Sequence, residues 1–444
     1  MPLTIPPFSR RLVELAAPLE PGLRTVTMNN AWLWARIDGL YARLAKPSEP
    51  GYGPVLPLDL TGLPFGVNVA GHLNSESGTG EAARMAIHTL RRLGVPCAAI
   101  NVAHPLDTLD LSRELNLQTA TPNAINLVYI NPDTLWYAVE VLGRRFFDGR
   151  YNIGVWNWEL ARTPENWRSL FPLFNEIWTP SSFVAEAVSV DSPVPVVRIP
   201  YPVPGDDEAQ RHPRSHFRIS DEPFVFLFLF HYHSVYERKN PLGVIEAFKA
   251  AFGDSRDVLL YIKASHATRD ATVEMRRAAA GANVRVVNRV MSRREVVALY
   301  NLCDCYVSLH RSEGFGLTPL EAMRAGKPVV ATAYGGAMDF MTNENSYLVR
   351  YQLTDVECEY PLYHVGSAWA DPDLDQAAAL MRFVHENPRD AVARAARAQS
   401  DIRDRLSVDA VSRIMRRRLI AIAAATGIPV PPTGQIAEAA RPVA

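Results

Sequence analysis

Short apolar runs alternate along most of the chain with segments in which apolar residues recur every three or four positions. Such runs are typical of buried strands, and the second pattern is typical of helices packed on them. We expect strands at residues 66–70, 96–101, 125–130, 151–156, 176–179, 195–199, 224–230, 258–262, 284–287, 305–309 and 328–332. The clearest intervening helices are 80–93, 135–143 and 182–188. The alternation predicts an α/β protein with mostly parallel, doubly wound sheets.

The length predicts two domains, because 444 residues exceed what one hydrophobic core usually holds. Composition and turn signals place the boundaries. We assign an N-terminal extension and linker to 1–64, a first α/β domain to 65–205, a second to 218–389, C-terminal helices to 390–426 and a loose tail to 427–444.

The N-terminal extension contains a short amphipathic pattern at residues 29–45, with tryptophans and basic residues. This pattern fits a helix at a membrane interface, and it also fits a helix docked on the protein's own surface. Both interpretations stay open at this point.

Composition excludes several classes of protein. Apolar residues make up 48% and charged residues 21%, and the net charge of −1 gives no general attraction to nucleic acid. The four cysteines lack the spacing of a zinc site or a disulfide framework, so we expect Cys303 and Cys305 to be buried thiols in a reducing compartment. No apolar run approaches the roughly 18 residues of a membrane span, and no secretory signal is visible. We therefore expect a cytoplasmic protein that is at most peripheral to a membrane.

The stretch at 312–328 reads SEGFGLTPLEAMRAGKP and lies between two of the expected strands. Glu313 precedes a glycine-flanked turn, Thr318 is a good N-cap residue, and Glu321 follows it by three positions. A strand, a turn, a short helix and another strand form a parallel α/β unit. Its turn is expected outside the carboxyl end of a strand, where such sheets bind ligands.

The residue types in this stretch suit a sugar nucleotide. Ionised carboxylates only accept hydrogen bonds, so Glu313 and Glu321 suit adjacent hydroxyls. Backbone N–H groups at a helix N-terminus suit a phosphate or sugar oxygen, and here these belong to Gly314, Phe315, Gly316, Leu317 and Thr318. Glu321 has a second interpretation, since it can complete a capping box with Thr318. Glu313 has no comparable role in capping.

Glu313 and Glu321 reproduce the E-x7-E motif of retaining GT-B glycosyltransferases, and the surrounding SEGFGLTPLEAMRAGKPVVAT closely resembles family 4 of these enzymes. The resemblance implies a GT-B fold, in which two Rossmann-like domains face a cleft and C-terminal helices cross back onto the first domain. It assigns donor-sugar binding and catalysis to Glu313, and ribose binding to Glu321.

Two cations precede a helix that Asn240 caps, at the sheet edge that carries the central stretch. Arg238 and Lys239 would neutralise a diphosphate leaving group there. In the resembled family an arginine and a lysine lie five residues apart, whereas counting back five from Lys239 reaches Ser234. Lys239 therefore carries over, and Arg238 matches the family in type but not in position.

The remaining donor-site candidates lie in loops. Gly78, Thr79 and Gly80 open a helix after the first strand, which suits phosphate approach and is also typical of a flexible turn. In the resembled family this loop lies near the donor diphosphate. We include Ser234 and Val290 among the donor-binding candidates.

The sequence departs from the family at GVWNWEL, where members usually have a histidine near the reacting carbon. Asn157 or Glu159 could fill that space, Glu159 could equally be a surface or capping acid, and the tryptophans could be core residues. Acidic residues at Asp371, Asp373 and Asp375 read as helix-start acids rather than metal ligands. We therefore expect no metal and no cofactor.

The resemblance implies retaining, metal-independent transfer of a hexosyl group, with mannosyl preferred, from a GDP- or UDP-sugar. The acceptor would be a saccharide or lipid-linked saccharide in bacterial surface polysaccharide biosynthesis, as in proteins that resemble GGAMDF at 335–340. Two alternatives remain: a sugar-nucleotide 2-epimerase of the same fold, and a non-catalytic partner subunit.

Overall fold

The structure is a computed structural model that describes residues 57–75, 77–103, 114–203, 212–357, 360 and 363–431, apart from the side chain of His233. The predictions for most of the N-terminal extension, including the helix at 29–45, and for the end of the tail lie outside these residues.

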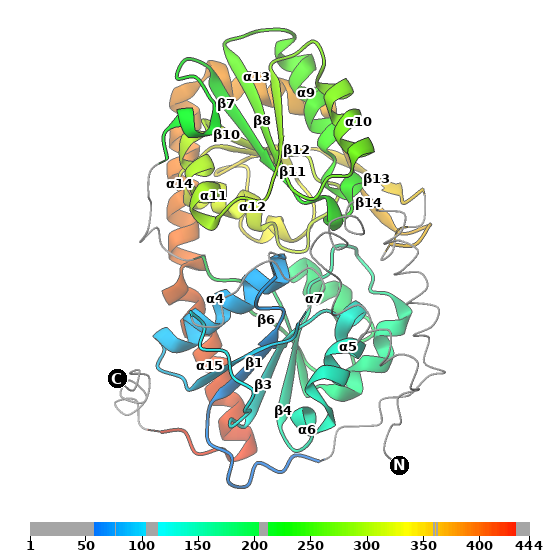
Figure 1. Cartoon of the computed structure of the whole chain (residues 1–444), viewed down its shortest axis with the longest axis vertical. Coiled ribbons are helices and arrows are strands. Elements are labelled where there is room, and N and C mark those ends of the chain that lie inside the picture. Colours follow the sequence, from blue (N-terminus) through cyan, green and yellow to red (C-terminus); the bar gives the residue numbers. More distant parts are fainter. Residues whose placement is uncertain are drawn as a thin grey trace, which may run out of the picture.

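The first domain is built on a parallel sheet with strand order β2-β1-β3-β4-β5-β6 (Figure 1). Its strands are β1 (Val67–Gly71), β2 (Cys97–Asn101), β3 (Ile125–Tyr129), β4 (Tyr151–Val155), β5 (Glu176–Thr179) and β6 (Val196–Arg198). Its helices are α4 (Gly78–Arg92), α5 (Pro132–Leu142), α6 (Arg144–Phe147), the 3₁₀ segment η1 (Glu165–Leu173) and α7 (Ser182–Ser189). Every residue of β1 and β3 is buried, as expected for strands that are covered on both faces.

The second domain repeats this architecture with strand order β12-β11-β10-β7-β8-β9. Its strands are β7 (Phe224–Leu229), β8 (Val258–Ala264), β9 (Val284–Asn288), β10 (Cys305–Ser308), β11 (Val329–Thr332) and β12 (Tyr347–Val349). Its helices include α8 (Tyr236–Lys239), α9 (Pro241–Phe252), α10 (Arg269–Ala279), α11 (Arg293–Leu302), α12 (Leu317–Arg324) and α13 (Leu374–Glu386). The two doubly wound domains confirm the fold class that the hydrophobic pattern predicted.

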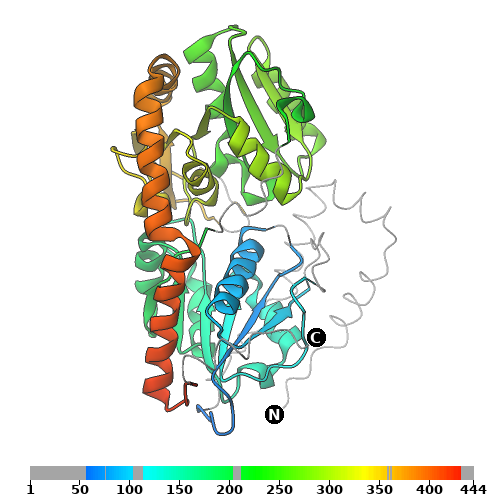
Figure 2. The same cartoon turned by 90° about the vertical axis from the view of Figure 1, so that its left-hand side faces the viewer.

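Two long helices close the fold. Figure 2 shows α14 (Pro388–Leu406) running beside the second domain and α15 (Val408–Thr426) continuing beside the first. Glu176 on β5 is fully buried and forms an ion pair with Arg418 of α15. Trp178 Nε1 donates to the same carboxylate over 2.6 Å, and Tyr151 Oη donates over 3.1 Å. This cluster fastens the last helix to the first domain.

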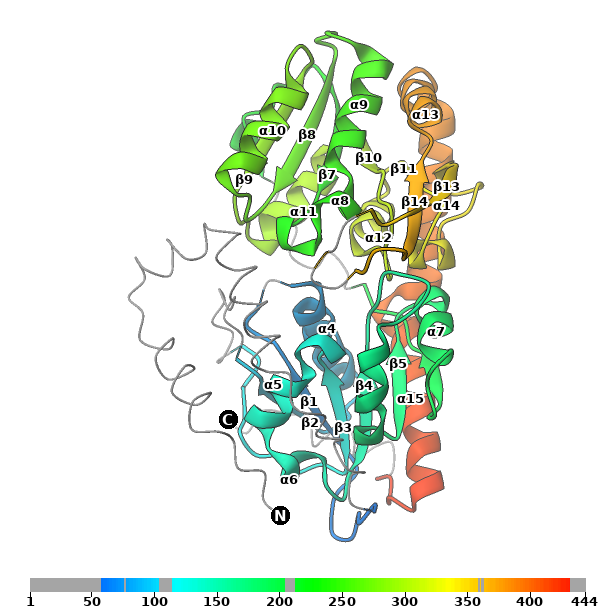
Figure 3. The ribbon, with the colours of Figure 1, turned by 90° about the vertical axis from the view of Figure 1, so that its right-hand side faces the viewer.

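An antiparallel hairpin of β13 (Tyr351–Asp355) and β14 (Ala368–Pro372) joins the two domains. Figure 3 shows it at the edge of the second domain that faces the first. Val356, Tyr363 and Trp369 of this hairpin are buried in a hydrophobic cluster that otherwise consists of first-domain residues, among them Trp158. The rings of Tyr363 and Trp158 meet edge to face with centroids 5.5 Å apart. The hairpin, which follows β12 of the second domain, therefore contributes to the core of the first domain.

Two further predictions concern burial and membranes. Cys303 and Cys305 are buried as predicted, and burial raises the pKa of Cys303 to about 12. Within the described ranges, no helix is both long enough and apolar enough to cross a membrane.

Candidate functional site

Glu313 lies in the turn after β10, and its carboxylate meets both predicted cations. It forms an ion pair with Lys239 Nζ, and its Oε2 lies 3.3 Å from Arg238 Nη1. Only 9% of Glu313 is exposed. Burial by itself would raise the pKa of this carboxyl, but Lys239, Arg238 and His310 more than offset it and lower the pKa to about 2. Glu313 is therefore an anion across the physiological range.

The two cations come from α8, which follows β7, the neighbour of β10 in the sheet. Val235 begins this helix at φ 56°, a left-handed conformation that is costly for a β-branched residue. Asn240 ends it, and its side chain caps α9 as predicted by accepting from Gly243 N. This short helix delivers Arg238 and Lys239 to the same edge as Glu313.

Arg238 is buried, and its guanidinium donates hydrogen bonds to the backbone. Its Nη1 donates to Ser312 O over 2.8 Å, its Nε donates to Ser234 O over 3.2 Å, and only 4% of the residue is exposed. The guanidinium thereby fixes the turn that carries Glu313. Ser234 takes part through its backbone carbonyl, while Val290 lies 44% exposed in the loop between β9 and α11.

The glycine turn packs directly on the first domain. A Cβ on Gly314 would lie 2.4 Å from Asn157 Oδ1 and 2.5 Å from Trp158 O, so no side chain fits there. Ser181 Oγ donates to Gly314 O over 2.5 Å from α7. Phe315 is buried and packs edge to face on Tyr201, which makes its side chain a core group.

The helix after this turn starts two residues earlier than predicted. Gly316, at φ 87°, is the N-cap of α12 and Leu317 is its first residue, so Thr318 does not cap the helix. The predicted capping box is therefore absent from α12. The first N–H groups of α12 still lack helical partners by geometry, and the helix begins four residues after Glu313.

Glu321 is instead paired with Arg293, a residue that the sequence analysis did not select. Arg293 Nη1 lies 2.5 Å from Glu321 Oε1, with 43% of the arginine side chain and 14% of the glutamate side chain exposed. Arg293 is the first residue of α11, which a capping box between Ser292 and Glu295 fixes in place. Its separation from Glu321 by 28 residues left no local signal.

The glycine loop of the first domain, at residues 78–80, lies close to the start of α12. Ser77 caps α4 by accepting from Gly80 N over 3.2 Å, and Ser77 Oγ lies 3.2 Å from Thr79 Oγ1. A Cβ on Gly78 would lie 3.9 Å from Leu317 Cδ1 at the start of α12. The structure thus brings together the two helix N-termini that we selected as diphosphate candidates.

Glu159 enters the site from the first domain, four residues beyond the end of β4. Its Oε1 lies 4.0 Å from Arg238 Nη2, its Oε2 accepts from Tyr363 Oη over 3.1 Å, and its backbone oxygen accepts from Ser312 Oγ. The surface or capping role considered from the sequence is therefore wrong. The neighbouring Trp156 and Trp158 are core residues.

His310 is another residue that sequence analysis missed. It is fully buried, its Nδ1 lies 3.0 Å from Ser308 Oγ, and its Nε2 lies 3.2 Å from Tyr334 O. Burial lowers its pKa, while the nearby Glu313 acts in the opposite direction. The sequence could have indicated this residue, because a histidine lies directly after the apolar run at 305–309 that includes β10.

The acidic residues before α13 have structural roles. Asp373 caps α13 by accepting from Gln376 N over 2.9 Å, and Asp371 lies 3.2 Å from Arg311. In the portion of the chain that the structure covers, no group of His, Cys, Asp and Glu has the arrangement of a metal site.

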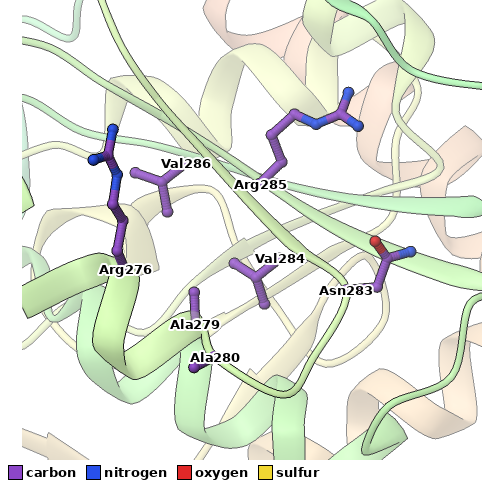
Figure 4. A pocket seen from close by; sticks show the side chains of 7 residues that line it. All are labelled: Arg276, Ala279, Ala280, Asn283, Val284, Arg285 and Val286. Carbon is purple, nitrogen blue, oxygen red and sulfur yellow. The ribbon is translucent and has the colours of Figure 1, made fainter. Parts of the chain in front are cut away.

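A surface pocket of about 370 Å³ lies away from these residues, between α10 and the edge strand β9 (Figure 4). It is lined by Arg276, Ala279, Ala280, Asn283, Val284, Arg285 and Val286. None of the predicted site residues lines this pocket.

Two facing doubly wound domains, a site at their border and C-terminal helices that cross back define the GT-B fold. The Anabaena protein HepE, solved in complex with UDP and glucose, shares this fold at a TM-score of 0.60 and 14% identity, covering 80% of this chain and all of that one. A glycosyltransferase from Rickettsia africae gives a TM-score of 0.61 at 14% identity, covering 81% of this chain and 98% of that one.

Residues 214–352 match the family model described as "Glycosyl transferases group 1", which confirms a resemblance to glycosyltransferases for the second domain. The lipopolysaccharide core biosynthesis mannosyltransferase LpsB of Rhizobium meliloti is 54% identical over 43 residues. That match spans 10% of this chain and 12% of the relative.

Proposed function

We propose that this protein is a family 4 enzyme that transfers a hexosyl group from a nucleoside-diphosphate sugar to a saccharide or lipid-linked saccharide, with retention of configuration. The observation that carries the proposal is the Glu313 carboxylate, held as an anion by Lys239 and Arg238 beside the N-terminus of α12. A buried carboxylate of this kind accepts hydrogen bonds from sugar hydroxyls. Cations and helix amides next to it stabilise the diphosphate that leaves.

The nucleotide is assigned to the second domain and the diphosphate to its border with the first. Glu321 lies one turn into α12, beyond the turn that carries Glu313, and would bind the ribose. Gly78 at the start of α4 faces Leu317, which supports a phosphate between the two helix N-termini. Since Lys239 and amides supply the positive charge, the transfer needs no metal and no cofactor.

The preferred donor is a mannosyl nucleotide, GDP- or UDP-linked, because the 43 residues shared with LpsB belong to a mannosyltransferase. We place the reaction in bacterial surface polysaccharide synthesis, in the cytoplasm or at the inner face of the membrane. The ion pair between Glu313 and Lys239 argues against a non-catalytic subunit, because a subunit that binds no donor would not need these two charges at the proposed donor site.

The proposal is tested by thermal denaturation with a panel of nucleotide sugars. We expect GDP-mannose or a UDP-hexose to raise the melting temperature, because a ligand that binds only the folded state stabilises it. The best donor is then assayed for release of nucleoside diphosphate with water and with methyl glycosides as acceptors. No stabilisation and no release with any donor would contradict the proposal.

The epimerase alternative is tested with the same donor and no acceptor. We expect slow hydrolysis and no other change in the sugar by NMR. Formation of the 2-epimeric nucleotide sugar would place the protein among the isomerases.

A further inference from the structure

Glu159 and Glu313 face each other across one guanidinium. Arg238 Nη1 lies 3.3 Å from Glu313 Oε2, and Arg238 Nη2 lies 4.0 Å from Glu159 Oε1. In the described part of the chain, Glu159 is the first-domain carboxylate that comes within 4.0 Å of Arg238. Any sugar held by Glu313 therefore lies within reach of a second carboxylate, which the other domain supplies.

The segment that carries Glu159 is fixed from several sides. Trp158 Nε1 donates to Arg162 O over 2.7 Å, and Asn157 N donates to Asn131 Oδ1 over 2.9 Å. Gly314 packs on Asn157 and Trp158 so closely that a side chain at position 314 would clash with both. The carboxylate is thus held in one place relative to Glu313, as an electrostatic group in a catalytic site must be.

Glu159 also keeps capacity for a ligand. It accepts from Tyr363 Oη over 3.1 Å and from Asn157 Nδ2 over 3.3 Å, while an ionised carboxylate offers about four acceptor positions. Its side chain is 17% exposed, against 4% for Arg238. The spare positions can face a bound sugar without any loss of the contacts that fix the side chain.

A second carboxylate lies close by in the first domain. Asp133 is in the first turn of α5, and its Oδ1 is buried without a hydrogen-bond partner among the described residues. Burial raises the pKa of Asp133 to about 6, and the charge of Glu159 acts in the same direction. Asp133 is therefore a second acidic side chain of the first domain that interacts with Glu159.

We propose that Glu159 is a catalytic residue whose carboxylate stabilises the positive charge that develops on the transferred sugar. This inference rests on the proposed function. The bond from the anomeric carbon to the diphosphate breaks and its electron pair leaves with the diphosphate, while the acceptor oxygen bonds to that carbon. The acceptor proton passes to the diphosphate, and Glu159 stays ionised throughout. A fixed anion facing the electron-poor sugar lowers the barrier most when the ring charge is greatest.

The test compares the full-length wild type with Glu159→Gln, which keeps an oxygen for Tyr363 but removes the charge. The readouts are melting temperature, donor Kd, and nucleoside diphosphate release with water and with methyl α-mannoside. We expect Glu159→Gln to lower kcat about a hundredfold or more for water and methyl glycoside alike, the scale of losing one electrostatic contact. Donor Kd and melting temperature should stay close to those of the wild type. Glu186→Gln, an exposed change on α7, is the matched control and should leave every readout unchanged.

Three outcomes would overturn the inference. Unchanged kcat would show that Glu159 takes no part in the reaction. Loss of transfer to methyl α-mannoside with normal hydrolysis would assign it to the acceptor instead. A drop in melting temperature or donor affinity that matches the loss of rate would leave only a role as a tether between domains.

A second variant removes the support without removing the charge. Tyr363→Phe should lower kcat several-fold at unchanged donor Kd, because the carboxylate is less well oriented. A wild-type chain that releases no diphosphate from any nucleotide sugar would contradict the proposed function itself. That result differs from an active wild type with an equally active Glu159→Gln, which contradicts this inference alone.

Discussion

Arg293 Nη1 lies 2.5 Å from Glu321 Oε1, so the carboxylate assigned to the ribose already has a charged partner. We expect Glu321→Gln to weaken donor binding about ten- to a hundredfold with little change in kcat, because a hydrogen bond to a charged group contributes roughly 1.5–3 kcal/mol. Arg293→Ala is the control that removes the ion pair and keeps the carboxylate. Titration calorimetry with the donor measures both. Normal donor affinity in Glu321→Gln would mean that the residue serves only its pair with Arg293.

Glu313→Gln should affect the chemical step rather than binding. The carboxylate lies beside the predicted position of the reacting sugar, and we expect kcat to fall by about a hundredfold or more. Steady-state kinetics of diphosphate release checks this, with donor Kd measured in parallel. A variant that loses donor affinity and keeps its kcat would move Glu313 from catalysis to simple binding.

Acid should destabilise the protein in part through Glu313, whose pKa lies at about 2 instead of its ordinary 4.5. Below pH 4.5 the unfolded chain binds this proton and the folded chain does not. The stability from this group is therefore complete above pH 4.5 and disappears as the pH falls towards 2, in total on the order of 3 kcal/mol. Urea denaturation over this range should show a flatter pH dependence for Glu313→Gln than for the wild type. Parallel curves would contradict the depressed pKa.

The Arg418–Glu176 pair should contribute strongly to stability, because Glu176 is fully buried. Among the described residues, Arg418→Ala leaves that carboxylate with Tyr151 and Trp178 as side-chain donors, and we expect a loss of about 3 kcal/mol, the lower end for breaking a buried pair. Arg417→Ala, an exposed change on the same helix, should cost little. Equal unfolding midpoints for the two variants would argue against this anchor.

Chelation should leave activity largely intact. In the proposed site, Lys239 and the amides at the start of α12 would take the role that a divalent cation has in other transferases, so we expect EDTA to reduce diphosphate release only slightly. Activity that EDTA abolishes and Mn²⁺ restores would show that this account of the diphosphate site is wrong.

The sequence predicted the strands well because a strand buried on both faces leaves an apolar run that needs no partner to be recognised. β5 has the predicted bounds, and most other strands differ by one or two residues. The β13–β14 hairpin was missed because most of β13 faces solvent and lacks such a run. Its place is set by antiparallel pairing and by Trp369, whose environment belongs to the other domain.

Some contacts in the candidate site could also be predicted from the sequence, and others could not. Glu313 and Lys239 follow adjacent parallel strands, β10 and β7, so their proximity could be predicted from topology. Gly316 replaced Thr318 as the N-cap because the close approach of Ala337 and a φ of 87° favour glycine there. Arg293 was not predicted, and Glu159 was named only as one of two residues that could fill the space of the missing histidine, since each meets its partner through packing between elements far apart in the chain.

The hairpin that buries Val356, Tyr363 and Trp369 against the first domain limits how the enzyme can move. Swinging the domains wide apart would expose these three side chains, at roughly 1.5–3 kcal/mol for each large apolar group. A small rotation about the hairpin leaves them covered. We therefore expect any rotation between the two halves that accompanies substrate binding to be small, with the hairpin as its pivot and Tyr363 remaining beside Glu159.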